Sequence, residues 1–116
     1  MESNELLKHA IKFTFTALPH DVAEKSPEAH HFNVYVELKS KDRWAVHTGY
    51  GDCYDSNLQS EYETLPSERT EAYKDHYRFP LDEAVEIAQR LAKTITIGNM
   101  NVEEYLEWWD EKHPED

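Results

Sequence analysis

The stretch from Pro80 to Ile95 carries the strongest structural signal in this chain. Its apolar residues recur at the spacing of one buried helix face: Leu81, Ala84, Val85, Ala88, Leu91, Ala92 and Ile95. Pro80 suits the first turn, because the N–H that proline lacks has no helical partner there. Acidic residues follow at the start and basic residues near the end, as the helix dipole favours. The pattern predicts an amphipathic helix that covers a sheet formed by other residues.

The residues before this helix alternate between apolar and polar side chains, as half-buried strands do. This period-two pattern occupies residues 9–18, 31–39 and 43–48. Residues 19–29 are predicted to form a polar connection. Gly49 and Gly51 predict a bulge or sharp bend after the third strand. A further hairpin is predicted from residues 53–54 and 61–65, on either side of the turn at residues 55–57.

The remaining elements are helical. Pro66 and Ser67 start a predicted short helix that reaches about His76, with Ser67 as its N-cap. Residues 94–97 predict a short strand, and Asn101 is expected to cap a last helix that runs from residue 102 to about 112, with Glu104 at the capping-box position. Strands first and helices afterwards predict an α+β fold, with an antiparallel sheet of about four strands followed by two or three helices covering one face.

The whole chain, residues 1–116, is expected to form a single domain with flexible termini at 1–7 and 113–116. One core is predicted to contain strand and helix residues together: Phe13, Phe15, Val34, Val36, Trp44, Val46, Val85, Ala88 and Leu91.

The net charge of −12 is spread unevenly along the chain. Residues 1–51 carry seven acids and six bases, whereas residues 52–116 carry seventeen acids and six bases. This balance argues against direct nucleic-acid binding and against anionic membranes, since both need a basic face. It favours a basic partner, or simply high solubility.

Cysteine usage and the N-terminus indicate the compartment. Cys53 is the only cysteine, so no disulfide can form within the chain. The N-terminus lacks the pattern of a signal peptide, and no apolar run approaches the length of a membrane span. The expected location is the cytoplasm of a host cell.

No motif in the sequence predicts an enzyme. The seven histidines form no H-x-x-x-H motif with a nearby glutamate, there is no C-x-x-C, and neither a metal nor a cofactor is expected. Cys53 could act as a nucleophile only with His47 or His76 beside it and a third residue to orient the base. The favoured interpretation of Cys53 is a small buried apolar residue.

The last helix carries the most informative candidate surface. Val102, Tyr105, Leu106 and Trp109 form the face expected to dock on the core, and Trp108 falls about 110° from its centre, among acids. An aromatic residue ringed by acids suits a protein-binding surface, although the alternatives of a groove-edge Trp and a solvated acidic face stay open. The candidate partner-binding residues are Asp52, Asp55, Glu61, Glu63, Glu103, Glu104, Glu107, Trp108, Asp110 and Glu111.

Three short motifs resemble a family of uncharacterised bacteriophage proteins. They are D-R-W-A-V at 42–46, Y-E-T-L-P-S-E-R-T at 62–70 and Y-R-F-P-L-D-E-A at 77–84, and the resemblance spans roughly residues 32–92. It implies a phage or mobile-element origin and no catalytic residues. Small acidic early phage proteins are often inhibitors of host enzymes, including anti-CRISPR and anti-restriction proteins, and some present carboxylates where DNA phosphates would lie.

Two functional hypotheses follow. The first is an acidic phage-type protein that inhibits a basic, nucleic-acid-handling host defence protein, such as a nuclease or CRISPR effector, by protein contact that imitates DNA phosphates. The alternative is a non-inhibitory phage accessory protein that acts as an oligomeric structural or regulatory module. An enzyme is the third and least favoured hypothesis.

Overall fold

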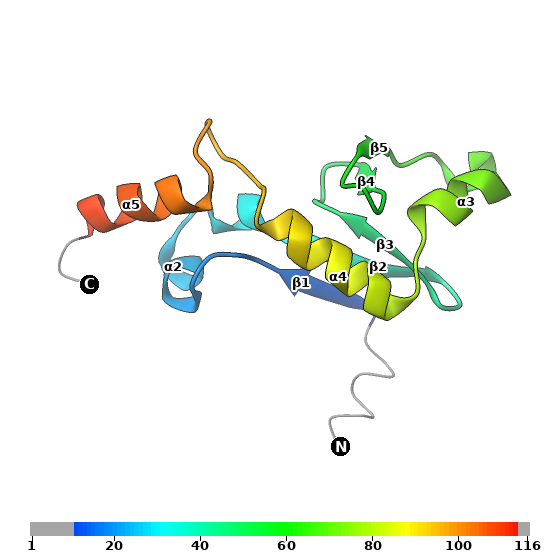
Figure 1. Ribbon diagram of the computed structural model, residues 1–116, viewed down its shortest axis with the longest axis horizontal. Helices are drawn as coiled ribbons and strands as arrows, with labels where there is room; N and C mark the ends of the chain where they lie inside the picture. Colours follow the sequence, from blue (N-terminus) through cyan, green and yellow to red (C-terminus); the bar gives the residue numbers. More distant parts are fainter. Residues whose placement is uncertain (1–10, 114–116) are drawn as a thin grey trace, which may run out of the picture.

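The computed structural model describes residues 11–113 and has an α+β fold. The strands are β1 (Lys12–Phe15), β2 (Val34–Ser40), β3 (Arg43–His47), β4 (Asp52–Tyr54) and β5 (Ser60–Tyr62). The α-helices are α2 (His20–Lys25), α3 (Glu71–Tyr77), α4 (Leu81–Ala92) and α5 (Val102–Lys112), and two short 3₁₀ turns are η1 (Ala29–Phe32) and η2 (Pro66–Glu68). Figure 1 shows α5 at one end of the molecule and α3 at the other.

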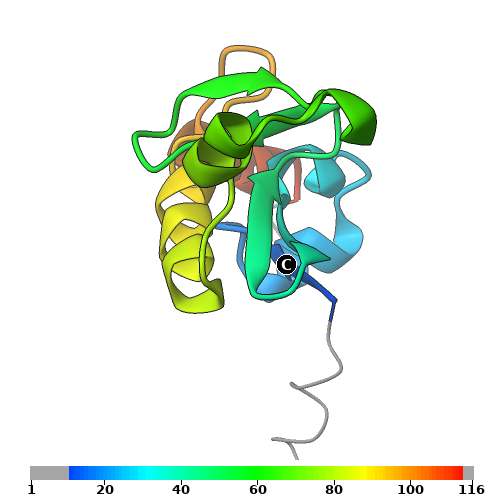
Figure 2. The same cartoon turned by 90° about the vertical axis from the view of Figure 1, so that its right-hand side faces the viewer.

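The central sheet has three antiparallel strands in the order β1-β2-β3, with Val36 paired to Phe13 on one side and to Val46 on the other. Helix α4 packs along this sheet and contacts all three strands (Figures 1 and 2). The predicted α+β fold is confirmed, and the expected hairpin forms a separate two-stranded sheet, β4-β5, so the antiparallel strands are divided between a sheet of three and a sheet of two.

The turn between β3 and β4 explains this separation. Gly49 and Gly51 have φ values of +88° and +76°, a backbone region that side-chain-bearing residues rarely adopt. Asp52 fixes the turn, because its carboxylate accepts hydrogen bonds from the backbone N–H and the hydroxyl of Thr48, at 3.1 and 2.6 Å. The bend predicted at the paired glycines is therefore confirmed, and it directs the chain out of the first sheet.

The main core lies between the sheet and α4. It contains buried residues from β2, β3, α4 and the segment before α4, namely Val34, Val36, Trp44, Val46, Phe79, Ala84, Ile87, Ala88, Leu91 and Ala92, with Phe13 and Phe15 packed against them. Eight of the nine predicted core residues belong to this group. The exception is Val85, which is only half-buried, while Ile87 is 2% exposed and takes the central position instead.

A second apolar cluster joins α5 to the segment that precedes β2. Tyr105 and Trp109 of α5 pack with Phe32 of η1 and Val22 of α2, and the rings of Tyr105 and Phe32 meet edge-to-face at 5.0 Å. Residues 19–29 are thus not simply a polar connection, since they contain a short helix. Burial of Val22 against α5 stabilises a helix whose length alone would not support it.

Several boundaries differ from those predicted. The helix expected from Pro66 divides into η2 and α3, and Thr70 rather than Ser67 caps α3, accepting a hydrogen bond from the Tyr73 N–H at 3.1 Å. The strand expected at residues 94–97 is reduced to one bridge between Ile97 and Met100. The capping box of α5 is confirmed, with the Glu104 N–H donating to Asn101 Oδ1 at 2.9 Å and the Asn101 N–H donating to Glu104 Oε1 at 3.0 Å.

The predicted flexible termini lie largely outside the described residues. Of residues 113–116, only His113 is described, and its N–H donates to the Trp109 carbonyl at 3.0 Å while its ring stacks on Trp109 at 3.9 Å. His113 therefore continues the order of α5.

Candidate functional site

Helix α5 presents a row of carboxylates on the side opposite its buried face. Tyr105 and Trp109 are 2% and 7% exposed, and the Tyr105 hydroxyl donates to Glu28 Oε2 at 3.1 Å and is hydrogen-bonded to Ser26 Oγ. These contacts fix the rotation of the helix about its axis. Its five acids are consequently all exposed, and we name this group the acidic face: Glu103, Glu104, Glu107, Asp110 and Glu111.

The negative charge of the acidic face is not neutralised by ion pairs within the described residues. Within the described part of the chain, no ion pair reaches any of its five carboxylates. The capping box occupies one oxygen of Glu104. Glu103, Glu107 and Asp110 recur at i, i+4 and i+7, so like charges repel along the helix by a few tenths of a kcal/mol per pair.

Trp108 lies beside the acidic face. Its side chain is 36% exposed, and its ring centroid is 5.5 Å from that of Tyr105, which supports one side of the indole. The prediction that Trp108 sits on the flank of the docked face is therefore confirmed. A supported and partly exposed indole is the kind of residue that dominates the energy of protein interfaces.

The acids predicted in the hairpin region are placed differently. Asp55 is 5% exposed, so the expectation of a surface carboxylate is wrong at this position. Its Oδ1 accepts the N–H groups of Asn57 and Gln59, both at 2.9 Å, and its Oδ2 contacts His76 Nε2 at 2.9 Å. Asp55 therefore stabilises the β4-β5 turn, and its carboxylate is too buried to contact a partner protein.

These contacts also set the acidity of Asp55. Burial by itself would raise the pKa of this carboxyl, but the two backbone hydrogen bonds and His76 outweigh burial, and the pKa is lowered. The carboxylate stays ionised at neutral pH, where its charge is used within the molecule.

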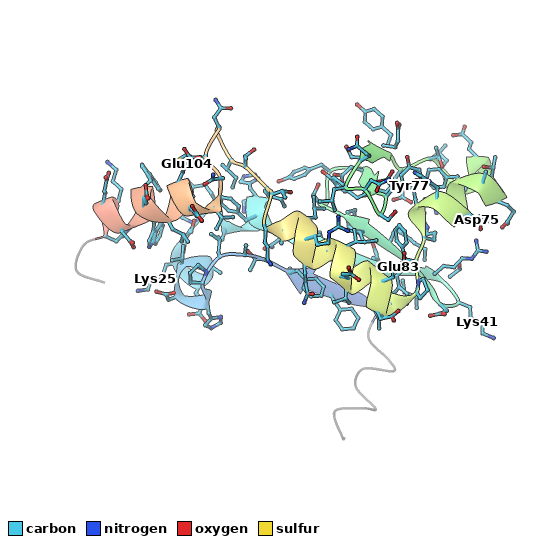
Figure 3. All side chains as sticks on the ribbon, viewed as in Figure 1. Lys25, Lys41, Asp75, Tyr77, Glu83 and Glu104 are labelled. Atoms are coloured by element: carbon cyan, nitrogen blue, oxygen red, sulfur yellow. The ribbon has the colours of Figure 1, made fainter. Side chains whose placement is uncertain are left out.

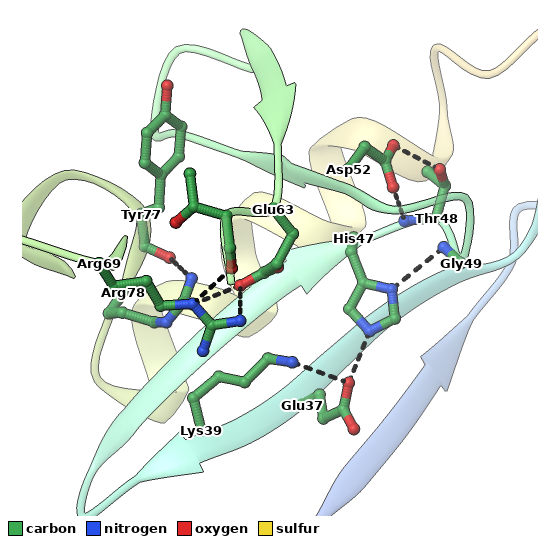
Figure 4. Close-up of polar contacts among 11 residues, drawn as sticks. Glu37, Lys39, His47, Thr48, Gly49, Asp52, Glu63, Arg69, Tyr77 and Arg78 are labelled. Carbon is green, nitrogen blue, oxygen red and sulfur yellow. Dashed lines mark hydrogen bonds and ion pairs between the residues drawn. The ribbon is translucent and has the colours of Figure 1, made fainter. Parts of the chain in front are cut away.

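Glu63 is likewise held inside the molecule. Its Oε1 contacts Nη2 of Arg78 and, at 3.3 Å, Nη2 of Arg69, as Figure 4 shows. The exposed fractions of the three side chains are 15% for Glu63, 3% for Arg78 and 17% for Arg69. Glu63 thus serves a nearly buried ion cluster, which corrects its expected position on a surface.

The two predicted groups of acids do not share one surface. In Figure 1, α5 lies at one end of the molecule and the β4-β5 hairpin lies towards the other. Glu61 is exposed on β5, while Asp52 is tied to Thr48. The structure therefore leaves α5 as the region where exposed candidate carboxylates gather, together with Trp108.

The groups considered for catalysis have structural partners. His47 Nε2 lies 2.9 Å from Glu37, and its Nδ1 accepts the Gly49 N–H at 3.0 Å, as Figure 4 shows. Cys53 is fully buried, as predicted for a packing residue, and its thiol lies 3.0 Å from the Tyr73 hydroxyl. Burial raises the pKa of Cys53, and burial together with Cys53 raises the pKa of Tyr73 to about 12.

Metal binding and membrane insertion are two further functions that the described residues bear on. Among residues 11–113, no three His, Cys, Asp or Glu side chains are grouped so that they could hold a metal ion. None of the helices in this range is both long enough and apolar enough to cross a bilayer.

Three comparisons with known proteins add no relative. No family model, no curated protein and no solved structure matches this chain. Function must therefore be inferred from the side chains themselves.

Proposed function

We propose that this chain is a binding protein that uses the acidic face of α5, with Trp108, to hold and inhibit a basic protein that handles nucleic acid. The observation that carries the proposal is the row of exposed carboxylates that no described basic residue pairs with. Mutual repulsion among these carboxylates lowers the stability of the free chain. The positive charges of a basic partner would attract the same carboxylates.

The chemistry of such a partner follows from the face. Lysines and arginines that line a nucleic-acid channel are spaced to meet phosphates, and carboxylates on one helix stripe offer negative charge at comparable intervals. Trp108 would add an apolar anchor that a phosphate backbone does not have. The phage resemblance of the sequence makes a host defence nuclease or CRISPR effector the proposed partner class.

A capture experiment tests this proposal. The full chain is immobilised and exposed to bacterial lysate, and the bound proteins are challenged with short duplex DNA. We expect a basic protein to be retained and then released by the DNA, because both ligands would occupy its phosphate-binding channel. Retention that DNA does not reduce would contradict phosphate imitation.

Two charge-reversal variants make the experiment specific. In the α5 variant, Glu103, Glu107 and Asp110 are replaced by Lys. In the control variant, the exposed α4 acids Asp82, Glu83 and Glu86 are replaced by Lys, which changes the net charge by the same amount. We expect the α5 variant alone to lose the captured protein, whereas equal loss in both would indicate a non-specific charge effect.

A further inference from the structure

A basic cleft lies in this strongly acidic protein. It has a volume of about 210 Å³ and is lined by five basic residues and one serine, without an acid: Lys39, Ser40, Arg43, Arg69, Lys74 and Arg78. We name this group the basic cleft. The entire chain has only 12 lysines and arginines, so the fold brings a large share of them to one small hollow.

The fold assembles the cleft from separate segments. Lys39 and Ser40 end β2, and Arg43 begins β3. The backbone groups of Trp44 and Phe79 exchange two hydrogen bonds, at 2.8 and 2.9 Å, and this bridge brings the preceding Arg78 beside the hairpin. In Figure 3, Lys41 of the hairpin and Asp75 of α3 lie at the same end of the molecule, where α3 contributes Lys74.

Two of the arginines are fixed in position before any ligand arrives. Arg69 Nε donates to the Thr64 carbonyl at 2.9 Å, and Arg78 Nη1 donates to the Tyr77 carbonyl at 3.1 Å. Both guanidinium groups share the single carboxylate of Glu63, so one positive charge of the pair is left without an equal negative charge (Figure 4). Binding an anion here would require little further ordering of side chains.

The other bases have weaker partners at the rim. Arg43 lies 3.7 Å from Glu71 and 3.9 Å from Asp75, and the two acids are 74% and 73% exposed. Lys74 lies 3.4 Å from Glu71, and Lys39 lies 3.5 Å from Glu37. Exposed pairs of this length contribute little to stability, so an incoming anion can replace them.

We propose that the basic cleft binds the phosphoryl group of a small phosphorylated compound. A phosphoryl group offers three acceptor oxygens and about −1.5 to −2 charge, which suits planar guanidinium donors. A volume of about 210 Å³ is sufficient for a phosphoryl group together with part of the small compound that carries it. Glu37, Glu71 and Asp75 stand around the rim, and their charges would repel the continuous phosphates of a nucleic-acid strand. This inference uses residues separate from the acidic face and stands independently of the proposed function.

The test is a titration of the full chain, followed by backbone amide NMR, with inorganic phosphate and with glycerol 3-phosphate. Ionic strength is held constant with chloride. We expect both probes to shift the amides of the basic cleft in a saturable way. Shifts that do not saturate, shifts that chloride reproduces, or a failure of glycerol 3-phosphate to bind would overturn the proposal. Equal or tighter binding of a single-stranded oligonucleotide at these amides would also overturn it.

Variants at the rim complete the test without disturbing the buried arginines. Arg43→Ala combined with Lys74→Ala should weaken binding of both probes by about tenfold or more, since two charged hydrogen-bond donors are lost. The exposed Lys41→Ala, next to the cleft but outside its lining, should bind within about twofold of the parent. Unchanged affinity in the double variant, with its fold verified by circular dichroism, would place the ligand elsewhere.

Discussion

At the level of single residues, the acids of this chain divide into those used inside the fold and those left exposed. Asp55 and Glu63 have several specific partners each, whereas Glu103, Glu107 and Asp110 have none among the described residues. Net charge alone therefore overstates the charge available to a partner.

Asp55 should make stability depend on pH in the acidic range. Because its folded pKa is lowered, its contribution is present in full above the unfolded value of about 3.9 and is lost as pH falls from there through the folded pKa. We expect Asp55→Asn to be less stable than the parent at neutral pH and to lose less unfolding free energy between about pH 5 and pH 3. Urea unfolding at both pH values measures this, and parallel losses in the two proteins would exclude the assigned role.

Glu63→Gln should be strongly destabilising. It leaves Arg78, with a side chain 3% exposed, without a carboxylate partner, and loss of one partner from a buried pair costs about 3–5 kcal/mol. Partial exposure of Arg69 places the expected loss near the lower figure. Glu61→Gln on the exposed strand β5 is the matched control and should stay within about 0.5 kcal/mol. Similar unfolding free energies for both variants would contradict the ion cluster.

The sequence predicted the positions of the exposed acids better than those of the acids that have partners inside the fold, and the reason is physical. Helical periodicity places Glu103, Glu107 and Asp110 on the outer stripe of α5, because one local period fixes all three positions. Glu63 depends on Arg78, fifteen residues away, and no local pattern reports that pairing. Asp55 had a usable signal, since an aspartate before Ser56-Asn57 often accepts the backbone N–H two residues on.

At the level of elements, α4 follows its sequence pattern most closely. The observed Leu81–Ala92 lies within the predicted stretch, and Ala84, Ala88 and Leu91 are buried as expected. The buried stripe is rotated so that Ile87 points into the core and Val85 lies at its edge. The apolar pattern predicted that α4 has one buried face, whereas packing against the sheet determines which residue lies at the centre of that face.

This rotation predicts unequal costs for two substitutions that shorten α4 side chains. Leu91→Ala should lose about 2–5 kcal/mol, the usual range for a buried leucine. Val85→Ala should lose about 1 kcal/mol or less, since a half-buried valine removes less apolar area and alanine favours the helix. Chemical denaturation of both variants measures the difference. A larger loss for Val85→Ala would show that α4 is rotated the other way.

The elements missed by the sequence are those that depend on distant packing. Helix α2 has six residues and is buried through Val22 against α5, some eighty positions later in the chain. The separation of β4-β5 from the first sheet depends on the turn at Gly49 and Gly51, whose glycines signalled a bend without giving its direction. Local patterns could predict that these segments were ordered or bent, but not what they pack against.

At the level of the whole molecule, opposite charges collect in different regions. The acidic face lies on α5 at one end, and the basic cleft lies at the end where the β2-β3 hairpin meets α3 (Figures 1 and 3). The excess of acids after residue 51 therefore does not form one continuous surface. A basic partner would be directed towards α5, and charge steering of this kind acts mainly on the rate of association.

The most direct test of this account is the rate of association between the chain and the basic protein that it captures, measured at low salt and at about 0.15 M salt. We predict that the parent associates fast at low salt and that salt slows its association steeply. We also predict that Glu103→Lys, Glu107→Lys and Asp110→Lys together slow association by about tenfold or more while changing dissociation less. The α4 control variant should follow the parent. Association rates that change neither with salt nor with the charge reversal on α5 would contradict a binding role for the acidic face.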